Sequence, residues 1–482
     1  MTRYCQQALT AIFLFLLSSG KLSAQAGEKW DLQKCVNYAL QNNITVRQAE
    51  LQVKFADLEL QLSKMAQYPT LNFSGNLGYG AGRNQDPTSF GLITTSYVFN
   101  NYSLQSNVEL FNWFSKKNSV KVKVLDMQAT KEGAEKAKND IALNVAVAYL
   151  QILLAREQIE LAKSKLAQTR SELESTHKQV DAGKLPELNA VNLESLFASD
   201  SSNLVTAETT ATQYLLNMKA LLNLDAGAAF DITTPPVDLI PLESLADLQP
   251  ESVYNLATQN MPQQKVDELN LRSAKTSVQV AKAGMYPTIS AFGSLGSSFN
   301  NRAKEPKSKT SLNVPVGTVT VGATSYQVFP LQPYEIYTYG NIPYFSQINN
   351  NFRQSVGIGL SVPILNGGTL RGGWKRAQLN VKQVELRKEQ NSFTLKQDIY
   401  KAYNDAVAAM QKYNANKKAV EASQKAYDFA VKRYDVGLLS TYDLVTTQNN
   451  LQSAKSQLLY AQYDYVFKMK LLEFYKGMGL KL

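Results

Sequence analysis

Apolar side chains recur at alternating spacings of four and three residues along a stretch from about Lys116 to Asp181. The stretch contains no proline and a single glycine, Gly133. This alternation is the heptad pattern of helices that supercoil around neighbours. At about 1.5 Å per residue such a helix is roughly 100 Å long, several times the length usual in globular domains. Its seam is Ile141, Val145, Ala148, Ile152, Ala155, Ile159, Ala162, Leu166, Thr169, Leu173, Thr176 and Val180.

A second heptad seam, built from smaller and more aromatic residues, runs from Leu395 to Tyr434. Shorter helical patterns flank both long ones, two beside each. Two short helices stacked end to end match the length of one long helix, so we predict a wall in which long helices alternate with stacked pairs. The short helices are predicted at about 31–66, 187–224, 250–284 and 441–476.

Between the helices the hydrophobic pattern changes to a period of two, in four stretches of about ten residues. In the first, Leu71 and Phe73 alternate with Asn72 and Ser74. One such strand would also fit a half-buried sheet of a soluble domain. Four strands of matching length, paired as two hairpins behind a secretion signal, favour transmembrane strands. They are predicted within 71–79, 102–110, 288–295 and 355–364.

Four strands are too few to close a barrel in a membrane. Open strand edges leave backbone N–H and C=O groups without partners, which is costly in hydrocarbon. Known spanning barrels begin at about eight strands. We therefore expect the chain to oligomerise so that strands of several copies close one barrel.

The first residues have the pattern of a secretory signal peptide. Arg3 precedes an apolar run of about ten residues, too short to span a bilayer. Ala24-Gln25-Ala26 fits a cleavage site. The mature chain then keeps one cysteine, Cys35, which cannot form an internal disulfide.

Charge and composition argue against nucleic-acid binding and catalysis. The 482 residues have a formal net charge of +10, but lysines and arginines are interleaved with acidic residues along the helices. Solvated helix faces explain this better than a nucleic-acid patch. The one histidine, His177, lies in a heptad-bearing helix, and no metal spacing, nucleophile elbow or phosphate loop occurs. We expect no enzyme activity and no catalytic, cofactor or metal site.

The chain repeats itself once. Residues 35–42 resemble 253–260, and the Tyr-Pro-Thr at Tyr68 recurs at Tyr286. Each unit reads as helix, β-hairpin, long helix, helix, which predicts an internal two-fold repeat. The predicted organisation is a signal peptide at 1–25, a first repeat at 26–240, a linker at 241–249 and a second repeat at 250–482, with an extended β-hairpin loop at about 297–351.

Taken together, these features resemble the TolC-like outer membrane efflux family. The resemblance covers nearly the whole mature chain and implies a mixed, mainly α fold: a homotrimer whose protomers each give four strands to a twelve-stranded β-barrel, with coiled-coil helices forming a periplasmic α-barrel. The matching segments are 30–43, both Tyr-Pro-Thr sequences, 362–368 and 433–445.

The family resemblance implies an outer-membrane exit duct of a tripartite efflux or type I secretion system. Its partners would be a periplasmic adapter (membrane fusion protein), an inner-membrane transporter and outer-membrane lipid. The main alternative is a secreted structural or adhesive coiled-coil protein without a pore, which should lack the alternating strands. A periplasmic adapter should have one helical hairpin between β halves rather than two repeats. Drugs, metals, polysaccharide precursors and secreted proteins all remain open as substrates.

The resemblance also assigns residues at the two helical hairpin tips. Asp443 matches a pore-narrowing aspartate, which in a trimer would form a ring of carboxylates favouring cations. Tyr434 matches a tyrosine involved in closure. Gly183 and Gly437 are placed to end the long helices. The tip residues implied to contact the adapter are Ala182, Gly183, Lys184, Val436, Gly437 and Leu438.

Three positions depart from the family pattern. The first repeat has Asn189 where the second has Asp443. A second family aspartate falls on Thr446, and a family arginine falls on Leu439. The network of charges that closes family channels is therefore expected to be thinner here.

Overall fold

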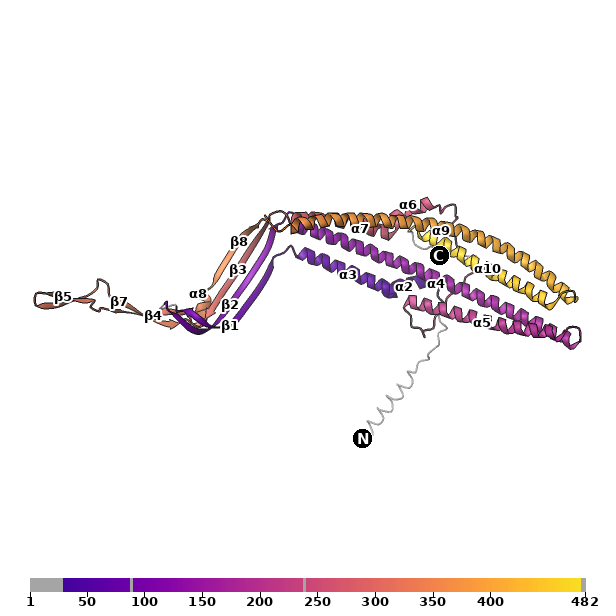
Figure 1. The fold of residues 1–482 in the computed structure, drawn as a ribbon, viewed down its shortest axis with the longest axis horizontal. Coiled ribbons are helices and arrows are strands. Elements are labelled where there is room, and N and C mark those ends of the chain that lie inside the picture. The colour runs from indigo at the N-terminus through magenta and orange to yellow at the C-terminus, as the bar shows by residue number, and fades with distance from the viewer. Residues whose placement is uncertain (1–28, 87–89, 237–239, 478–482) are drawn as a thin grey trace, which may run out of the picture. The chain divides into compact units, whose positions relative to one another are not determined.

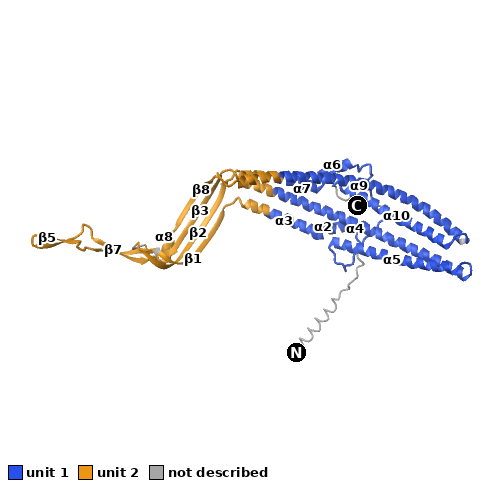
Figure 2. Ribbon diagram, viewed as in Figure 1, with its two compact units in different colours: residues 1–58, 124–273, 381–482 blue, residues 59–123, 274–380 orange. Residues whose placement is uncertain are grey.

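The computed structural model describes residues 29–86, 90–236 and 240–477, so the predicted signal peptide lies outside the described residues. The chain divides into two compact units, coloured separately in Figure 2. Unit 1 comprises Met1–Leu58, Val124–Ser273 and Val381–Leu482, and unit 2 comprises Glu59–Lys123 and Ala274–Asn380.

Long and short helices follow the predicted order along the chain (Figure 1). The two long helices, α4 and α9, have 67 residues each. None of the described helices combines the length and the apolarity that crossing a membrane requires. The helices are α2 (Leu32–Asn42), α3 (Ile44–Met65), α4 (Ser115–Asp181), α5 (Glu187–Leu222), α6 (Pro250–Asn260), α7 (Pro262–Ala283), α9 (Thr369–Asp435) and α10 (Thr441–Phe474).

The prediction of single helices at about 31–66 and 250–284 was wrong, because each is broken once. At Asn43 the backbone is extended, and the side chain caps the next helix by accepting a hydrogen bond from the Thr45 N–H at 2.8 Å. At Met261 the backbone is also extended, because the following Pro262 disfavours the helical conformation in the residue before it. Proline then suits the first position of α7.

Unit 1 contains two apolar cores, one beside α2 and one beside α6. The first joins α2 to the middle of α4, the end of α5 and part of α10, and the second joins α6 to α9 and the end of α10. The fully buried large side chains of the first include Ile152, Leu153, Met218, Leu222 and Ile232, and those of the second include Leu248, Ile399, Met469 and Leu472.

Unit 2 contains an antiparallel sheet in the order β1-β2-β3-β8, visible in Figure 1. β1 and β2 are longer than the predicted ten residues, with 16 and 20. They are longer because their backbone pairing runs from the pair Thr70–Asn107 to the pair Gln85–Leu92. It thus extends beyond the segment in which apolar and polar residues alternate. The strands are β1 (Thr70–Gln85), β2 (Leu92–Phe111), β3 (Thr288–Asn300) and β8 (Arg353–Ser361).

The extended loop predicted at about 297–351 contains regular structure. Two antiparallel ribbons, β4 with β7 and β5 with β6, are followed by a short helix, α8. Their side chains are largely exposed. The bounds are β4 (Lys304–Leu312), β5 (Gly317–Val321), β6 (Thr324–Val328), β7 (Tyr334–Asn341) and α8 (Tyr344–Asn350).

We expect the thiol of Cys35 to be unreactive in the folded protein. It is fully buried in the first core, and burial raises its pKa to about 12. At pH 8 the mature chain should therefore resist alkylation by iodoacetamide and react fully in denaturant, as measured by intact mass. Comparable labelling rates in the native and unfolded states would contradict this placement of α2.

Candidate functional site

The sheet of unit 2 has one apolar and one polar face. Phe73 pairs with Leu104, and Leu104 pairs with Leu295, so these side chains share a face. On the other face the hydroxyl of Ser74 lies 2.8 Å from that of Ser103. Several large side chains of the apolar face, such as Phe73 and Val356, are more than half exposed. The apolar face carries Leu71, Phe73, Leu77, Tyr79, Val98, Leu104, Ile289, Ala291, Leu295, Val356, Ile358 and Leu360.

Aromatic side chains gather at both ends of this sheet. At the end near the helices, the rings of Trp113 and Tyr286 are 4.7 Å apart. At the other end, the rings of Phe299 and Tyr344 are 4.8 Å apart, and the Tyr344 hydroxyl lies 3.0 Å from that of Tyr102. Phe299 and Tyr102 belong to the apolar face, so α8 covers the end of that face. Aromatic girdles at both ends of an apolar band are typical of transmembrane strands.

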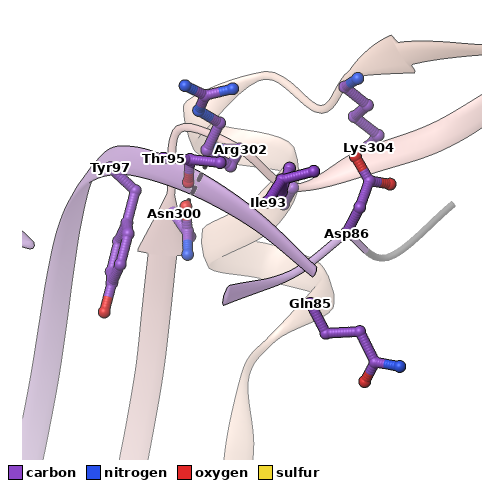
Figure 3. A pocket seen from close by; sticks show the side chains of 9 residues that line it. Gln85, Asp86, Ile93, Thr95, Tyr97, Asn300, Arg302 and Lys304 are labelled. Carbon is purple, nitrogen blue, oxygen red and sulfur yellow. Dashed lines mark hydrogen bonds between the residues drawn. The ribbon is translucent and has the colours of Figure 1, made fainter. Parts of the chain in front are cut away.

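The polar face ends in a hollow of about 450 Å³ beside the turn between β1 and β2. Figure 3 shows the charged ends of Arg302 and Lys304 at the same rim of this hollow, with the Tyr97 side chain directed away from them. Arg302 is held there by a hydrogen bond that its Nε donates to the carbonyl of Ser96 at 3.1 Å. The Asp86 carboxylate lies beside Lys304 in the same view, so the rim carries both positive and negative charge (Figure 3).

Both long helices end in the same glycine motif. At the end of α4, the Lys184 N–H donates to the Gln179 carbonyl at 2.8 Å, and Gly183 has φ +69°. At the end of α9, the Leu438 N–H donates to the Arg433 carbonyl at 2.8 Å, and Gly437 has φ +74°. This is the Schellman arrangement, in which a left-handed residue favours glycine. The two hairpin tips thus have matching backbone geometry.

Asp443 lies in the first turn of α10, which Ser440 caps. The Ser440 hydroxyl accepts a hydrogen bond from the Asp443 N–H at 3.1 Å and donates one to its carboxylate at 2.7 Å. Asp443 and Thr446 are both exposed. Asn189 occupies the matching third position of α5 and is half-buried, with its N–H donating to the Pro186 carbonyl at 3.0 Å. No hydrogen bond between described residues joins Asn189 to Asp443.

Tyr434 links the two hairpins near their tips. Its hydroxyl lies 3.1 Å from the Thr176 hydroxyl on α4 and 3.3 Å from the Thr441 hydroxyl on α10. Both threonines are almost completely buried. The sequence did not identify Thr441, and it placed Thr176 only as a seam position. The seam position of Thr176 was the available signal, but its pairing with Tyr434 depends on how α4 and α9 are rotated about their axes.

The residues predicted to meet an adapter are exposed at the tips. Val436 and Leu438 are 68% and 69% exposed, and Ala182 and Lys184 are exposed as well. Leu188, which the sequence did not single out, is 65% exposed on the other hairpin. Exposed apolar side chains concentrated at one site mark an interaction surface.

The model of a family described as outer membrane efflux protein matches residues 35–224 and 253–474. The chain is similar to the outer membrane efflux protein BepC of Brucella suis, with 22% identity over 463 residues, which are 96% of this chain and 88% of BepC. It is also similar to the outer membrane protein TolC of Escherichia coli, with 25% identity over 118 residues, which are 24% of each chain.

Among solved structures, the fold matches that of CusC with a TM-score of 0.75 and 17% identity, over 94% of this chain and 92% of that one. It matches the outer membrane protein VceC of Vibrio cholerae with a TM-score of 0.70 and 15% identity, over 93% and 97%.

Replacing Gly437 by alanine should loosen this tip. A left-handed conformation costs a residue with a Cβ about 1–2 kcal/mol. We expect amides of residues 433–441 to exchange hydrogen roughly five to thirty times faster, measured by mass spectrometry. Gly133→Ala is the matched control, because Gly133 lies inside α4 with open space around it. Equal exchange in the Gly437→Ala variant and the native chain would contradict the assigned motif.

Proposed function

Because this chain belongs to the outer membrane efflux protein family, we propose that three copies of it assemble into one exit duct of a tripartite efflux or type I secretion system. The protein is an outer membrane efflux channel with a periplasmic helical extension. Nothing supports the alternative of a secreted structural or adhesive coiled-coil protein. We propose no catalytic role. The observation that carries the proposal is the sheet of unit 2, which is apolar on one face and has two open edges.

The open edges require closure by other copies. β1 and β8 are the outer strands of the sheet, so one edge of each pairs with no other strand among the residues that the structure describes. In hydrocarbon every such row must be paired. Pairing β1 of one copy with β8 of the next removes both edges, and three copies would give a closed barrel of twelve strands. The polar face, with Ser74 and Ser103, then lines the pore.

The helices that adjoin these edge strands carry exposed apolar stripes. α3 leads into β1, and α9 follows β8. On α3 the exposed apolar residues keep heptad spacing, and on α9 they recur every seven residues. Paired edges would bring α3 of one copy beside α9 of the next, and these stripes would cover each other as a coiled-coil seam. The α3 stripe is Leu51, Phe55, Leu58, Leu62 and Met65, and the α9 stripe is Leu379, Leu386, Phe393 and Tyr400.

We further propose that the hairpin tips dock a periplasmic adapter that joins the channel to an inner-membrane transporter. The exposed Val436 and Leu438 on one tip, and Gly183 and Lys184 on the other, would form this surface. The apolar band between the aromatic girdles would contact outer-membrane lipid. The matching order of elements in residues 26–240 and 250–482 supports an internal repeat, with 241–249 as its linker.

Asp443 is proposed to set the constriction of the pore. Three copies would place three exposed carboxylates, each held by Ser440, around the channel axis. Thr446 and Asn189 would be uncharged neighbours. Tyr434 would hold the tips closed through Thr176 and Thr441. Closure at this layer would then rest on neutral hydrogen bonds, consistent with Leu439 and Thr446 replacing charged family residues.

Placing a charge on the α3 stripe should prevent assembly. Phe55 is 53% exposed, and Phe55→Asp would bury a carboxylate in the proposed seam, at a cost of several kcal/mol per copy. We expect detergent-solubilised variant to run mainly as single chains in size-exclusion chromatography with light scattering. Lys64→Asp, an exposed change on α3 outside the stripe, should leave the native mass unchanged. A Phe55→Asp variant with the native mass would refute the seam.

Neutralising the proposed constriction should change ion selectivity. In planar bilayers the native protein is expected to give discrete, cation-selective conductance steps. Asp443→Asn should move the reversal potential in a salt gradient toward zero, because a ring of negative charge is lost. Glu187→Gln removes a carboxylate from the first turn of α5 and serves as the control. A water-soluble protein that gives no conductance would overturn the proposed function itself.

A further inference from the structure

A second polar layer joins the two hairpins, farther from the tips than Tyr434. Oε1 of Glu172, on α4, accepts a hydrogen bond from the Tyr427 hydroxyl on α9 at 2.6 Å. It also accepts one from the Gln168 amide at 3.2 Å, and Gln168 in turn donates to the Tyr427 hydroxyl. Glu172 is therefore the acceptor through which α4 holds α9.

The same layer continues to α5 and α10. Asp200 of α5 is 1% exposed, and its Oδ2 accepts a hydrogen bond from the Thr169 hydroxyl at 2.8 Å. Its Oδ1 lies 2.8 Å from the ammonium of Lys165. Gln448 of α10 is 2% exposed and its amide nitrogen lies 3.5 Å from the Thr169 hydroxyl. All four helices of the two hairpins thus meet around buried polar groups.

Three buried oxygens in this layer accept no hydrogen bond from the described residues: Oε2 of Glu172, Oε1 of Gln448 and Oδ1 of Asp200. The last of these is compensated by its ion pair with Lys165. Leaving buried acceptors without hydrogen bonds costs about 1–3 kcal/mol each, and more for a charged group. The Gln448 amide is close enough to the Glu172 carboxyl to affect its pKa. A proton on Oε2 would remove the negative charge from a carboxyl group whose second oxygen is buried and has no donor among the described residues.

Burial and the charge of Asp200 favour the protonated form of Glu172. Burial raises the pKa of Glu172 most, and the negative charge of Asp200 raises it further, whereas the hydrogen bonds from Tyr427, Gln168 and Gln448 lower it. Lys165 is paired with Asp200. From α9, burial and Glu172 hold the Tyr427 hydroxyl neutral by raising its pKa, and Asp428 adds negative charge. From α10, the described hydrogen bonds to this layer come from the uncharged side chains of Gln448 and Asn449.

We propose that Glu172 is a proton-binding site, and that its neutral carboxyl group holds α9 and α10 against α4 in the closed arrangement of the tips. This inference rests on the proposed function, because it assigns the packing of the hairpins to a closed channel. Thr169 lies one heptad from Thr176, and Gln448 lies one heptad from Thr441, so this layer and the Tyr434 layer are about two helical turns apart on the same faces of the helices. Loosening one layer therefore frees the next.

The pH dependence of the packing between the hairpins follows from the raised pKa of Glu172. The packed state binds the proton more tightly than the loosened state, because the pKa is raised in the packed state. Its stabilisation is thus fully present at acidic pH and is lost as the pH rises through the raised value. The periplasmic hairpins would be held together in acid and released toward neutral and alkaline pH.

Spin labels across the layer test this directly. Ser171→Cys and Lys425→Cys place labels at exposed positions of α4 and α9, in a Cys35→Ala background of the mature chain in detergent. Double electron–electron resonance should give a narrow distance distribution at pH 5 that broadens as the pH rises to 8.5. In Glu172→Gln, whose amide can make the same bonds as the protonated acid, the distribution should stay narrow throughout.

Two further variants separate this role from a merely structural one. Tyr427→Phe removes a donor that favours the ionised carboxylate, so its transition should move to higher pH. Glu174→Gln, at an exposed carboxylate on the same helix, should behave like the native chain. A distribution that does not change with pH in the native chain, or changes equally in Glu172→Gln, would overturn the proposal. Because the distances are measured without ion flow, a failure of conductance would count against the channel function and not against this site.

Discussion

A row of unpaired backbone N–H and C=O groups cannot remain in hydrocarbon, and the proposed assembly of the chain follows from this constraint. The sheet of unit 2 has such a row at β1 and another at β8. Its apolar face has to meet lipid, because side chains such as Phe73 and Val356 are exposed over most of their surface. A sheet with these two properties is stable in a membrane only when other copies complete it. The exposed stripes on α3 and α9 extend the same requirement to the helices.

Much of this architecture is readable from the sequence because it depends on local periodicity. The seam through Ile152 and Thr169 specifies a coiled coil, and the alternation of Phe73 with Ser74 specifies a two-faced strand. The break at Met261 was also readable, since Pro262 follows it. The cap that Ser440 provides for α10 also has a local signal, because the acidic Asp443 follows three residues later. The break at Asn43 was harder to foresee, because its amide donates to the distant Leu221 carbonyl at 2.8 Å.

Contacts between helices could not be derived in the same way. Whether Tyr434 meets Thr176 depends on the rotation of α4 and α9 about their axes, which heptad spacing fixes only approximately. The cluster around Glu172 was missed for the same reason. Buried polar residues at single seam positions often fix the register of a coiled coil. We propose that in this chain they also hold the hairpin tips closed.

The central claim is that the edges of β1 and β8 are paired between copies. Hydrogen exchange of their backbone amides in the detergent-solubilised assembly tests it most directly. Paired edges predict that the outward amides of Thr70–Gln85 and Arg353–Ser361 exchange as slowly as those of the inner strands β2 and β3. Rapid exchange confined to the outer rows, with β2 and β3 protected, would mean that the sheet ends in open edges and that the proposed barrel does not form.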